Sequence, residues 1–227
     1  KSFSTYLPDY VIKMFPEDIS EDMCSIHENV ERLVVTTEIK MTKEFDILDY
    51  KFYRSIVKSK KQFTYEEVKD IVEYNEYEND NILDSINLMY KIYKNIRNKS
   101  KLKIPELKFD ETIKINYLDE IHEMIEEMMI LNNRLIAEYF KKNNKIFIGR
   151  NHEEPELNDN YNLLKMVNNK FNEFNFNNIN RILDIKNDNY LINLFLVQQI
   201  MPKARYNIDK DSHWGLDVKN YSHFTSP

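Results

Sequence analysis

Glycine and cysteine are scarce in this sequence of 227 residues, which has two glycines, Gly149 and Gly215, and one cysteine, Cys24. Dinucleotide-binding fingerprints and P-loops each need several glycines so that the backbone can approach a phosphate, and the sequence excludes both. One cysteine excludes an internal disulfide and a zinc site built from cysteines, and it favours a reducing compartment. We therefore expect an intracellular protein, either cytoplasmic or nuclear.

Long apolar runs and an excess of positive charge are also absent. No run approaches the roughly 18 residues that a transmembrane helix needs, and no signal peptide is visible, so we expect no association with a membrane. The net charge of -6 argues against a broad basic surface for duplex nucleic acid. It is compatible with a narrow basic channel inside an acidic protein.

Apolar side chains are plentiful enough for a folded core, because 42% of the residues are hydrophobic and 13% are aromatic. The length suits one large domain or two small ones. Since no internal repeat and no domain linker is visible, we expect a single domain over residues 1–227.

Alternating apolar and polar residues predict a β-hairpin early in the chain. The stretch from Leu33 to Met41 alternates, with Leu33 and Val35 on the face expected to be half-buried. A second strand over residues 45–58 would pair with it in antiparallel fashion. A capping box at Thr64 and Glu67 then predicts the start of a helix.

Helical patterns dominate the rest of the chain. Asp80 and Asp188 are candidate caps for two helices, residues 101–110 are expected to form a basic loop, and another helix is expected near Leu163. Together these elements predict an α+β fold, in which an antiparallel hairpin or sheet packs with several helices around a long central helix.

The longest helical pattern begins near Leu118 and reaches Tyr139, with apolar residues every three or four positions. Glu120, Glu123 and Glu127 form a neighbouring acidic stripe, so a cation or a hydrogen-bond donor is expected opposite them. One interpretation is a core helix with a solvated acidic edge. The other is a helix whose carboxylate and amide side chains face a ligand together with basic residues that follow it.

Several kinds of catalytic and metal sites find no support. The sequence has no Gly-x-Ser-x-Gly elbow and no tight cluster of three or four aspartates. Asp211, His213 and His223 could bind a metal, but ordinary hydrogen-bonding histidines are the favoured interpretation. Nothing in the spacing supports a catalytic pair between Cys24 and a histidine.

The remaining polar residues are suited to binding a polyanion. Phosphate could be bound by Arg150, His152, Lys203, Arg205, His213 and His223. Bases of a single strand could stack on Tyr206, Trp214, Tyr221 and Phe224. Glu127 could accept a hydrogen bond from a ribose 2′-hydroxyl, the group that distinguishes RNA from DNA.

Seven blocks of sequence resemble the catalytic RNB domain of the ribonuclease II and ribonuclease R family, in the family's order. They are YLPDYVIKMFPE with MCSI and ERL, YRSIV with TYEEV, HEMIEEMMILNN, RNHEEP, MPKARY, HWGL and YSHFTSP. The resemblance covers nearly the whole chain, and it identifies the chain as the central to C-terminal part of one RNB domain.

The resemblance implies an enzyme that hydrolyses single-stranded RNA from its 3′ end to nucleoside 5′-monophosphates, with Mg²⁺ as cofactor. It also implies flanking OB-type RNA-binding domains in a longer polypeptide. Carried over through the matching motifs, the residues expected to bind RNA are Glu127, Asn133, Arg150, His152, Tyr206, His213, Tyr221, His223, Thr225 and Ser226.

Two parts of the family pattern are missing. The aspartate cluster that holds the metal would lie upstream of this chain, and the arginine of the TSPIRRY motif would follow Pro227. No catalytic residue or metal ligand is therefore expected within the chain, which we expect to be inactive alone. The alternative is a catalytically inactive RNA-binding or protein-interaction module derived from the same family.

Overall fold

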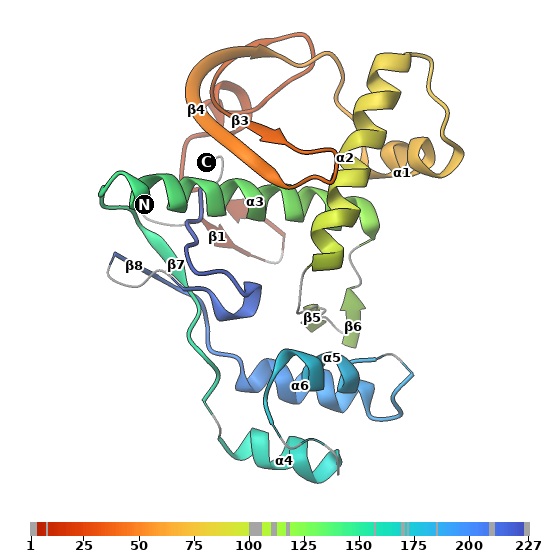
Figure 1. Cartoon of the computed structure of the whole chain (residues 1–227), viewed down its shortest axis with the longest axis vertical. Helices are drawn as coiled ribbons and strands as arrows, with labels where there is room; N and C mark the ends of the chain where they lie inside the picture. The colour runs from red at the N-terminus through yellow and green to blue at the C-terminus, as the bar shows by residue number, and fades with distance from the viewer. Residues whose placement is uncertain are drawn as a thin grey trace. The chain divides into compact units, whose positions relative to one another are not determined.

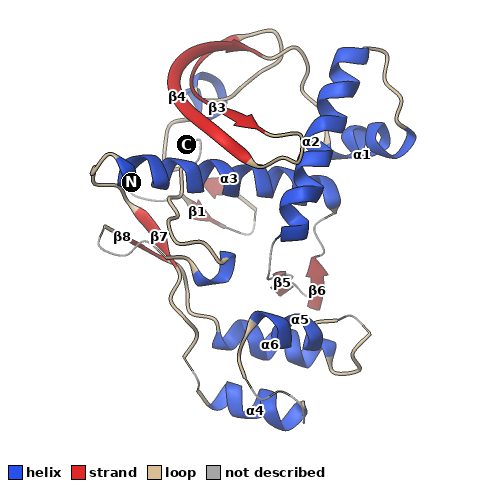
Figure 2. Ribbon diagram, viewed as in Figure 1, coloured by secondary structure: helices blue, strands red, loops and turns tan. Residues whose placement is uncertain are grey.

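Helices and antiparallel hairpins alternate along the chain in the computed structural model (Figures 1 and 2), which confirms the α+β class. The structure describes residues 4–7, 9–99, 106–109, 113–116, 119–156, 158–168, 171, 173–184, 186–208 and 212–224. The chain divides into two compact units, the first ending at Leu83 and the second covering Asp84–Phe224. None of the helices in these described ranges is long and apolar enough to cross a membrane.

A long hairpin dominates the first unit. Strand β3 (Glu31–Met41) pairs antiparallel with β4 (Ile47–Lys58), and Leu33 lies opposite Ile56. This confirms the predicted pairing of the two strands. The turn between them is stabilised by the side chain of Thr42, which accepts a hydrogen bond from the amide of Asp46 at 3.1 Å.

The prediction that Leu33 and Val35 lie on a half-buried face was wrong. Leu33 is 85% exposed, and Val35 and Ile56 beside it are exposed as well. Period-two alternation shows which residues share one face of a strand, but it does not show what covers that face. The sequence therefore predicted the strand correctly and the burial of its end incorrectly.

Short elements surround the hairpin in the chain. Strands β1 (Thr5–Tyr6) and β2 (Val11–Ile12) form a small antiparallel pair, and a π-helical segment, η1, covers Asp18–Met23. Helix α1 (Tyr65–Tyr74) begins at the predicted capping box, where the Glu67 amide donates to the Thr64 hydroxyl at 3.2 Å.

Helix α2 (Asp80–Lys99) begins one residue after its cap. The side chain of Asn79 accepts the hydrogen bond from the amide of Ile82 at 3.3 Å, so Asn79 and not Asp80 caps this helix. Both residue types are good caps, so the sequence pattern alone could place the boundary only to within a residue or two.

The long helix of the second unit is α3 (Glu120–Lys142), which starts where the side chain of Asp119 accepts hydrogen bonds from the amides of Ile121 and His122. Before it, strands β5 (Glu106–Phe109) and β6 (Ile113–Asn116) form an antiparallel hairpin, and β5 lies where part of a basic loop was expected.

Three helices form a hydrophobic cluster in the second unit. They are α4 (Asp159–Val167), α5 (Phe176–Ile182) and α6 (Tyr190–Ile200), and Figure 1 shows α5 and α6 next to each other. The cluster is built from Tyr161, Leu164, Phe171, Ile179, Ile182, Leu183, Tyr190, Leu194, Leu196, Val197 and Ile200. Asn189, not Asp188, precedes α6, and its side chain makes no capping hydrogen bond.

Two short strands and a single helical turn complete the second unit. Strand β7 (Gly149–Asn151) pairs antiparallel with β8 (Arg205–Asn207), and a 3₁₀ turn, η2, covers Trp214–Leu216. Of the residues that the sequence predicts to bind RNA, Arg150 lies in β7 and Tyr206 in β8, while His152 directly follows β7 and His213 directly precedes η2.

Candidate nucleic-acid interface

The pairing of β7 with β8 places a cation against an aromatic ring. Arg150 lies directly opposite Tyr206 in the register, so both side chains project from the same face of the strand pair. The Arg150 guanidinium lies over the Tyr206 ring, 5.1 Å from its centroid. This distance is within the range of a cation–π contact.

The segment around Ser222 lies along the other edge of β7. Ser222 is bridged to Gly149 in antiparallel fashion, and the Arg150 amide donates to the carbonyl of Tyr221 at 2.9 Å. His223 therefore comes next to Tyr206, and the Tyr206 hydroxyl lies 2.6 Å from His223 Nδ1. We call Arg150, Tyr206 and His223 the basic–aromatic surface.

Asn133 connects α3 to this surface. Its side-chain amide donates to the Tyr221 hydroxyl at 3.2 Å, and its Oδ1 accepts from the backbone amide of Phe224 at 3.1 Å. The Asn133 side chain is almost fully buried, with 1% of its surface exposed. Asparagine is a mediocre helix former, but here its side chain joins the segment on either side of His223 to the long helix.

Two buried histidines lie behind the surface. The rings of His152 and His213 stack with centroids 5.1 Å apart, and Trp214 stacks on His152 from the η2 turn. Burial, followed by the charges of His152 and Arg150, lowers the pKa of His213 to about 4. Burial also lowers the pKa of His152, so both rings are neutral at neutral pH and not ready-made phosphate ligands.

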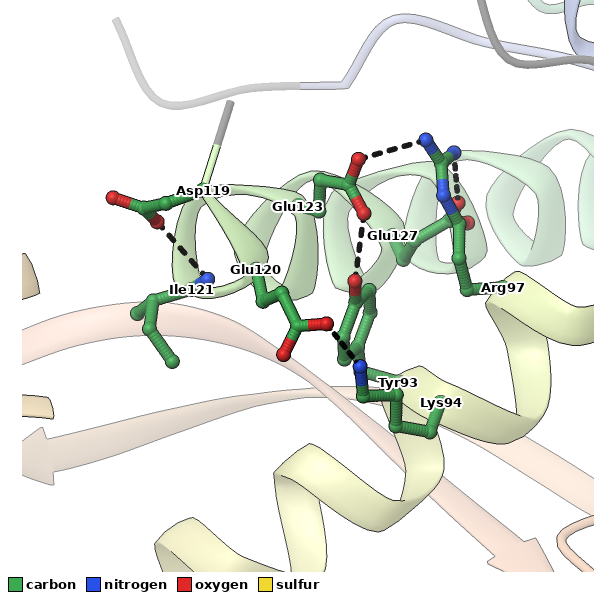
Figure 3. A network of polar contacts seen from close by, with 8 residues as sticks. All are labelled: Tyr93, Lys94, Arg97, Asp119, Glu120, Ile121, Glu123 and Glu127. Atoms are coloured by element: carbon green, nitrogen blue, oxygen red, sulfur yellow. Dashed lines mark hydrogen bonds and ion pairs between the residues drawn. The ribbon is translucent and has the colours of Figure 1, made fainter. Parts of the chain in front are cut away.

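Helix α2 supplies the positive charge that the acidic stripe of α3 was expected to need (Figure 3). Arg97 donates to Glu127 and to Glu123, each at 3.0 Å. The Tyr93 hydroxyl donates to Glu123 at 2.6 Å, and Lys94 pairs with Glu120. The predicted partners of these carboxylates are confirmed.

This network occupies the carboxylate of Glu127. The residue is 5% exposed, and its carboxylate pairs with Arg97, which is not a residue of the basic–aromatic surface. The ligand-facing interpretation therefore holds only in part. The Asn133 amide contacts Tyr221 and Phe224, which lie on either side of His223 in the chain, whereas the Glu127 carboxylate pairs with Arg97 of α2.

Glu126 is a candidate that the sequence interpretation missed. It lies seven residues before Asn133, which in an α-helix places both residues on nearly the same face. Glu126 is exposed, and its negative charge is one of the influences that raise the pKa of Tyr221, after burial as the largest. The seven-residue spacing was visible in the sequence and could have pointed to Glu126.

The predicted RNA-binding residues fall into two groups. Tyr206 and His223 are exposed and Arg150 is half-buried, whereas Asn133, His152, His213 and Tyr221 are buried and act as supports. Thr225 and Ser226 lie outside the described residues.

The other predicted contacts also differ in exposure. Phe224, Lys203 and Arg205 are exposed. Trp214 instead packs against the hydrophobic cluster, with its ring 4.8 Å from that of Phe176. Trp214 is therefore a packing residue here, in place of the base-stacking residue that was predicted.

A magnesium site does not fit the residues whose placement the structure gives. Among them, no group of three or more His, Cys, Asp or Glu side chains is arranged to hold a metal ion. The residues gathered around Arg150 are suited to binding an anion or a flat ring, and not to coordinating a divalent cation.

The family to which this chain belongs follows from comparison with known protein families. A family model described as "RNB domain" matches residues 1–227. The chain belongs to the RNB domain family. Ribonuclease R of Buchnera aphidicola is 30% identical to this RNB chain over 99% of its length, and the match covers 34% of that relative. The chain thus spans about a third of the length of the curated relatives that it matches.

Solved structures share the fold of this RNB chain. Ribonuclease R of Mycoplasma genitalium, in complex with ribose-methylated single-stranded RNA, matches all of the chain and 39% of its own length, with a TM-score of 0.83 and 24% identity. Yeast Ssd1, described as a pseudonuclease, matches 99% of the chain and 30% of its own length, with a TM-score of 0.76 and 18% identity.

Proposed function

We propose that this chain forms an RNA-binding part of an exoribonuclease that degrades single-stranded RNA from the 3′ end. The observation that carries the proposal is the basic–aromatic surface, where a guanidinium suited to phosphate and two exposed rings suited to bases lie together. Membership of the RNB family and the name of the curated relatives, ribonuclease R, support the same class of substrate.

The finer parts of the proposal come with the family resemblance. They are release of nucleoside 5′-monophosphates, dependence on Mg²⁺, flanking OB-type domains and a location inside the cell. Because the described residues do not fit a magnesium site, the metal ligands would come from outside them. We therefore expect the isolated chain to bind RNA without hydrolysing it.

The test is made on the complete polypeptide that contains this chain. The purified protein is given 5′-labelled single-stranded RNA and DNA of the same sequence, first with Mg²⁺ and then with a chelator. Much faster shortening of the RNA than of the DNA, from the 3′ end and only with Mg²⁺, is the expected result. Shortening of DNA to the same extent would contradict the proposal.

The alternative is a catalytically inactive module that binds RNA or a protein. It is favoured by the character of the gathered residues, which are all suited to binding, and by the shared fold with a protein described as a pseudonuclease. In the same assay it would give tight RNA binding with no shortening under either condition.

Two neighbouring glutamates, Glu126 and Glu127, are candidates for the predicted contact with the ribose 2′-hydroxyl. The matching motif points to Glu127, but the exposure of Glu126 and its place on the Asn133 face of α3 favour Glu126. We expect Glu126→Gln to reduce the preference for RNA over DNA. Glu127→Gln should weaken activity on both substrates alike, because it loosens the contact with Arg97.

The ratio of RNA to DNA cleavage rates measures this directly. If the ratio falls for Glu127→Gln and does not change for Glu126→Gln, the ribose contact is made by Glu127.

A further inference from the structure

The rings of Tyr206 and His223 are nearly parallel, and a hydrogen bond joins them. Their planes differ by 14°, and their centroids are 6.1 Å apart. The hydrogen bond of 2.6 Å joins the phenol oxygen to Nδ1. Because the lone pair or proton of Nδ1 lies in the plane of the imidazole, this bond holds the two rings side by side and not one above the other.

The resulting flat surface is accessible. Tyr206 is 58% exposed and His223 is exposed. The Arg150 guanidinium covers one face of the Tyr206 ring, so the exposure of Tyr206 comes from its edges and from the opposite face. A flat ligand could therefore lie on the side away from Arg150.

Fixed backbone contacts hold both rings in place. Tyr206 is held by the pairing of β8 with β7. On either side of His223, Ser222 donates to the carbonyl of Ile148 at 3.2 Å, and the Phe224 amide donates to Asn133 at 3.1 Å. A surface whose parts are already ordered loses little conformational entropy when a ligand binds.

Charge next to this plane favours an anionic ligand. Among the residues that the structure describes, no carboxylate forms an ion pair with Arg150, and its guanidinium lies over the Tyr206 ring. A guanidinium presents several donors in a planar fork that suits a phosphate. A flat aromatic group joined to a phosphate, which is to say a nucleotide, fits both features.

We propose that Tyr206 and His223 form a two-ring platform that stacks a purine base of single-stranded RNA, with Arg150 at a phosphate of the same strand. This inference rests on the proposed RNA-binding function and names the kind of nucleotide that the site prefers. A purine has two fused rings and can overlap part of each ring of the platform. A pyrimidine is smaller and overlaps less of it.

The hydrogen bond between the two rings is the element that distinguishes this platform from a single stacking tyrosine. Tyr206→Phe keeps the ring but removes the hydroxyl that aligns His223. Tyr206→Ala removes the stacking ring itself. Tyr74→Ala is a matched control, because Tyr74 is a tyrosine of similar exposure on α1.

The experiment measures equilibrium binding of the complete protein to uniform adenylate and uridylate RNA oligonucleotides of equal length. A chelator prevents turnover, and fluorescence anisotropy is the readout. A second readout uses a single 2-aminopurine moved along the adenylate strand, because its fluorescence falls on stacking.

We expect the unaltered protein and Tyr74→Ala to bind the adenylate strand more tightly, with one position of 2-aminopurine strongly quenched. Tyr206→Ala should weaken adenylate binding on the order of tenfold and abolish that quenching. Tyr206→Phe should keep part of the affinity but lose most of the difference between the two strands.

Other results would overturn the platform. Equal binding of both strands by the unaltered protein, or an unchanged preference in Tyr206→Phe, would contradict it while leaving RNA binding intact. Failure of the unaltered protein to bind either strand would instead overturn the proposed function, and the platform with it.

Discussion

Asn133 stabilises the fold through two hydrogen bonds to residues that lie much later in the chain. Its side-chain amide pairs with the Tyr221 hydroxyl and with the Phe224 backbone amide, and the Asn133 side chain itself is almost fully buried. In α3 itself asparagine is a mediocre helix former, so its benefit comes from tertiary contacts.

Replacing Asn133 with Ala should therefore lower the free energy of unfolding by about 1–3 kcal/mol, because two polar groups lose their partner in a buried place. Urea unfolding measures the change. Asn162→Ala, at an exposed position of α4, serves as the control and should change stability by less than about 0.5 kcal/mol. A loss of equal size in both variants would show that Asn133 has no special role.

His213 makes stability depend on pH. Its pKa falls from the usual 6.5 to about 4 in the folded protein, chiefly through burial. The unfolded chain therefore binds more protons between these two values. The contribution is fully present above pH 6.5 and is lost as the pH falls toward 4, and it amounts to at most about 3 kcal/mol.

Urea unfolding at pH 7 and at pH 5 tests this expectation. The unaltered protein should be less stable at pH 5, and His213→Gln should reduce the difference between the two conditions. An unchanged difference in the variant would assign the pH dependence to other groups.

At the scale of elements, ion pairs and a hydrogen bond from a tyrosine hydroxyl hold helices α2 and α3 together. Arg97 lies between Glu123 and Glu127, and Tyr93 and Lys94 reach Glu123 and Glu120 from the same helix (Figure 3). Burial makes a charged pair costly to form and still more costly to break on one side only. Glu127 is the most buried of the three carboxylates.

Arg97→Met should lower the free energy of unfolding by about 3 kcal/mol, since it leaves the buried Glu127 carboxylate without its partner. The double variant with Glu127→Leu should regain part of this loss, because the most buried carboxylate is then no longer left without its partner. Lys94→Met, which breaks a more exposed pair, should cost less than about 1 kcal/mol. Chemical unfolding of the four proteins compares these values, and equal stability of the single and double variants would contradict the argument.

At the scale of the whole molecule, an acidic protein carries a local basic surface. The net charge is -6, yet Arg150 lies beside the exposed rings of Tyr206 and His223. Local charge and not net charge governs contact with phosphate, because salt screens charges farther away than about 8 Å at physiological ionic strength.

RNA affinity of the complete protein should therefore fall as salt rises, despite the negative net charge. Arg150→Gln should weaken binding to all sequences and should reduce the slope of log affinity against log salt by roughly 0.7, the share of one phosphate on a single strand. Titrations at three or more salt concentrations give both slopes. Identical slopes would show that Arg150 does not contact phosphate.

Local sequence determined the elements of this protein. The hairpin of β3 and β4, the capping box at Thr64 and the length of α3 follow from alternation, capping and helical spacing, which depend on residues close together in the chain. The motifs also identified the RNB family, and the acidic stripe of α3 correctly predicted a cation or a hydrogen-bond donor opposite it.

Only the tertiary structure decided which side chains meet. It exposed Leu33, paired Glu127 with Arg97, and brought Tyr206 beside His223, 17 residues later in the chain. The physical reason is that periodicity gives the face of an element on which a residue lies, whereas the partner of that face depends on how distant segments pack. For that reason the kind of residues in the candidate site could be predicted from the sequence, and the division into exposed contacts and buried supports could not.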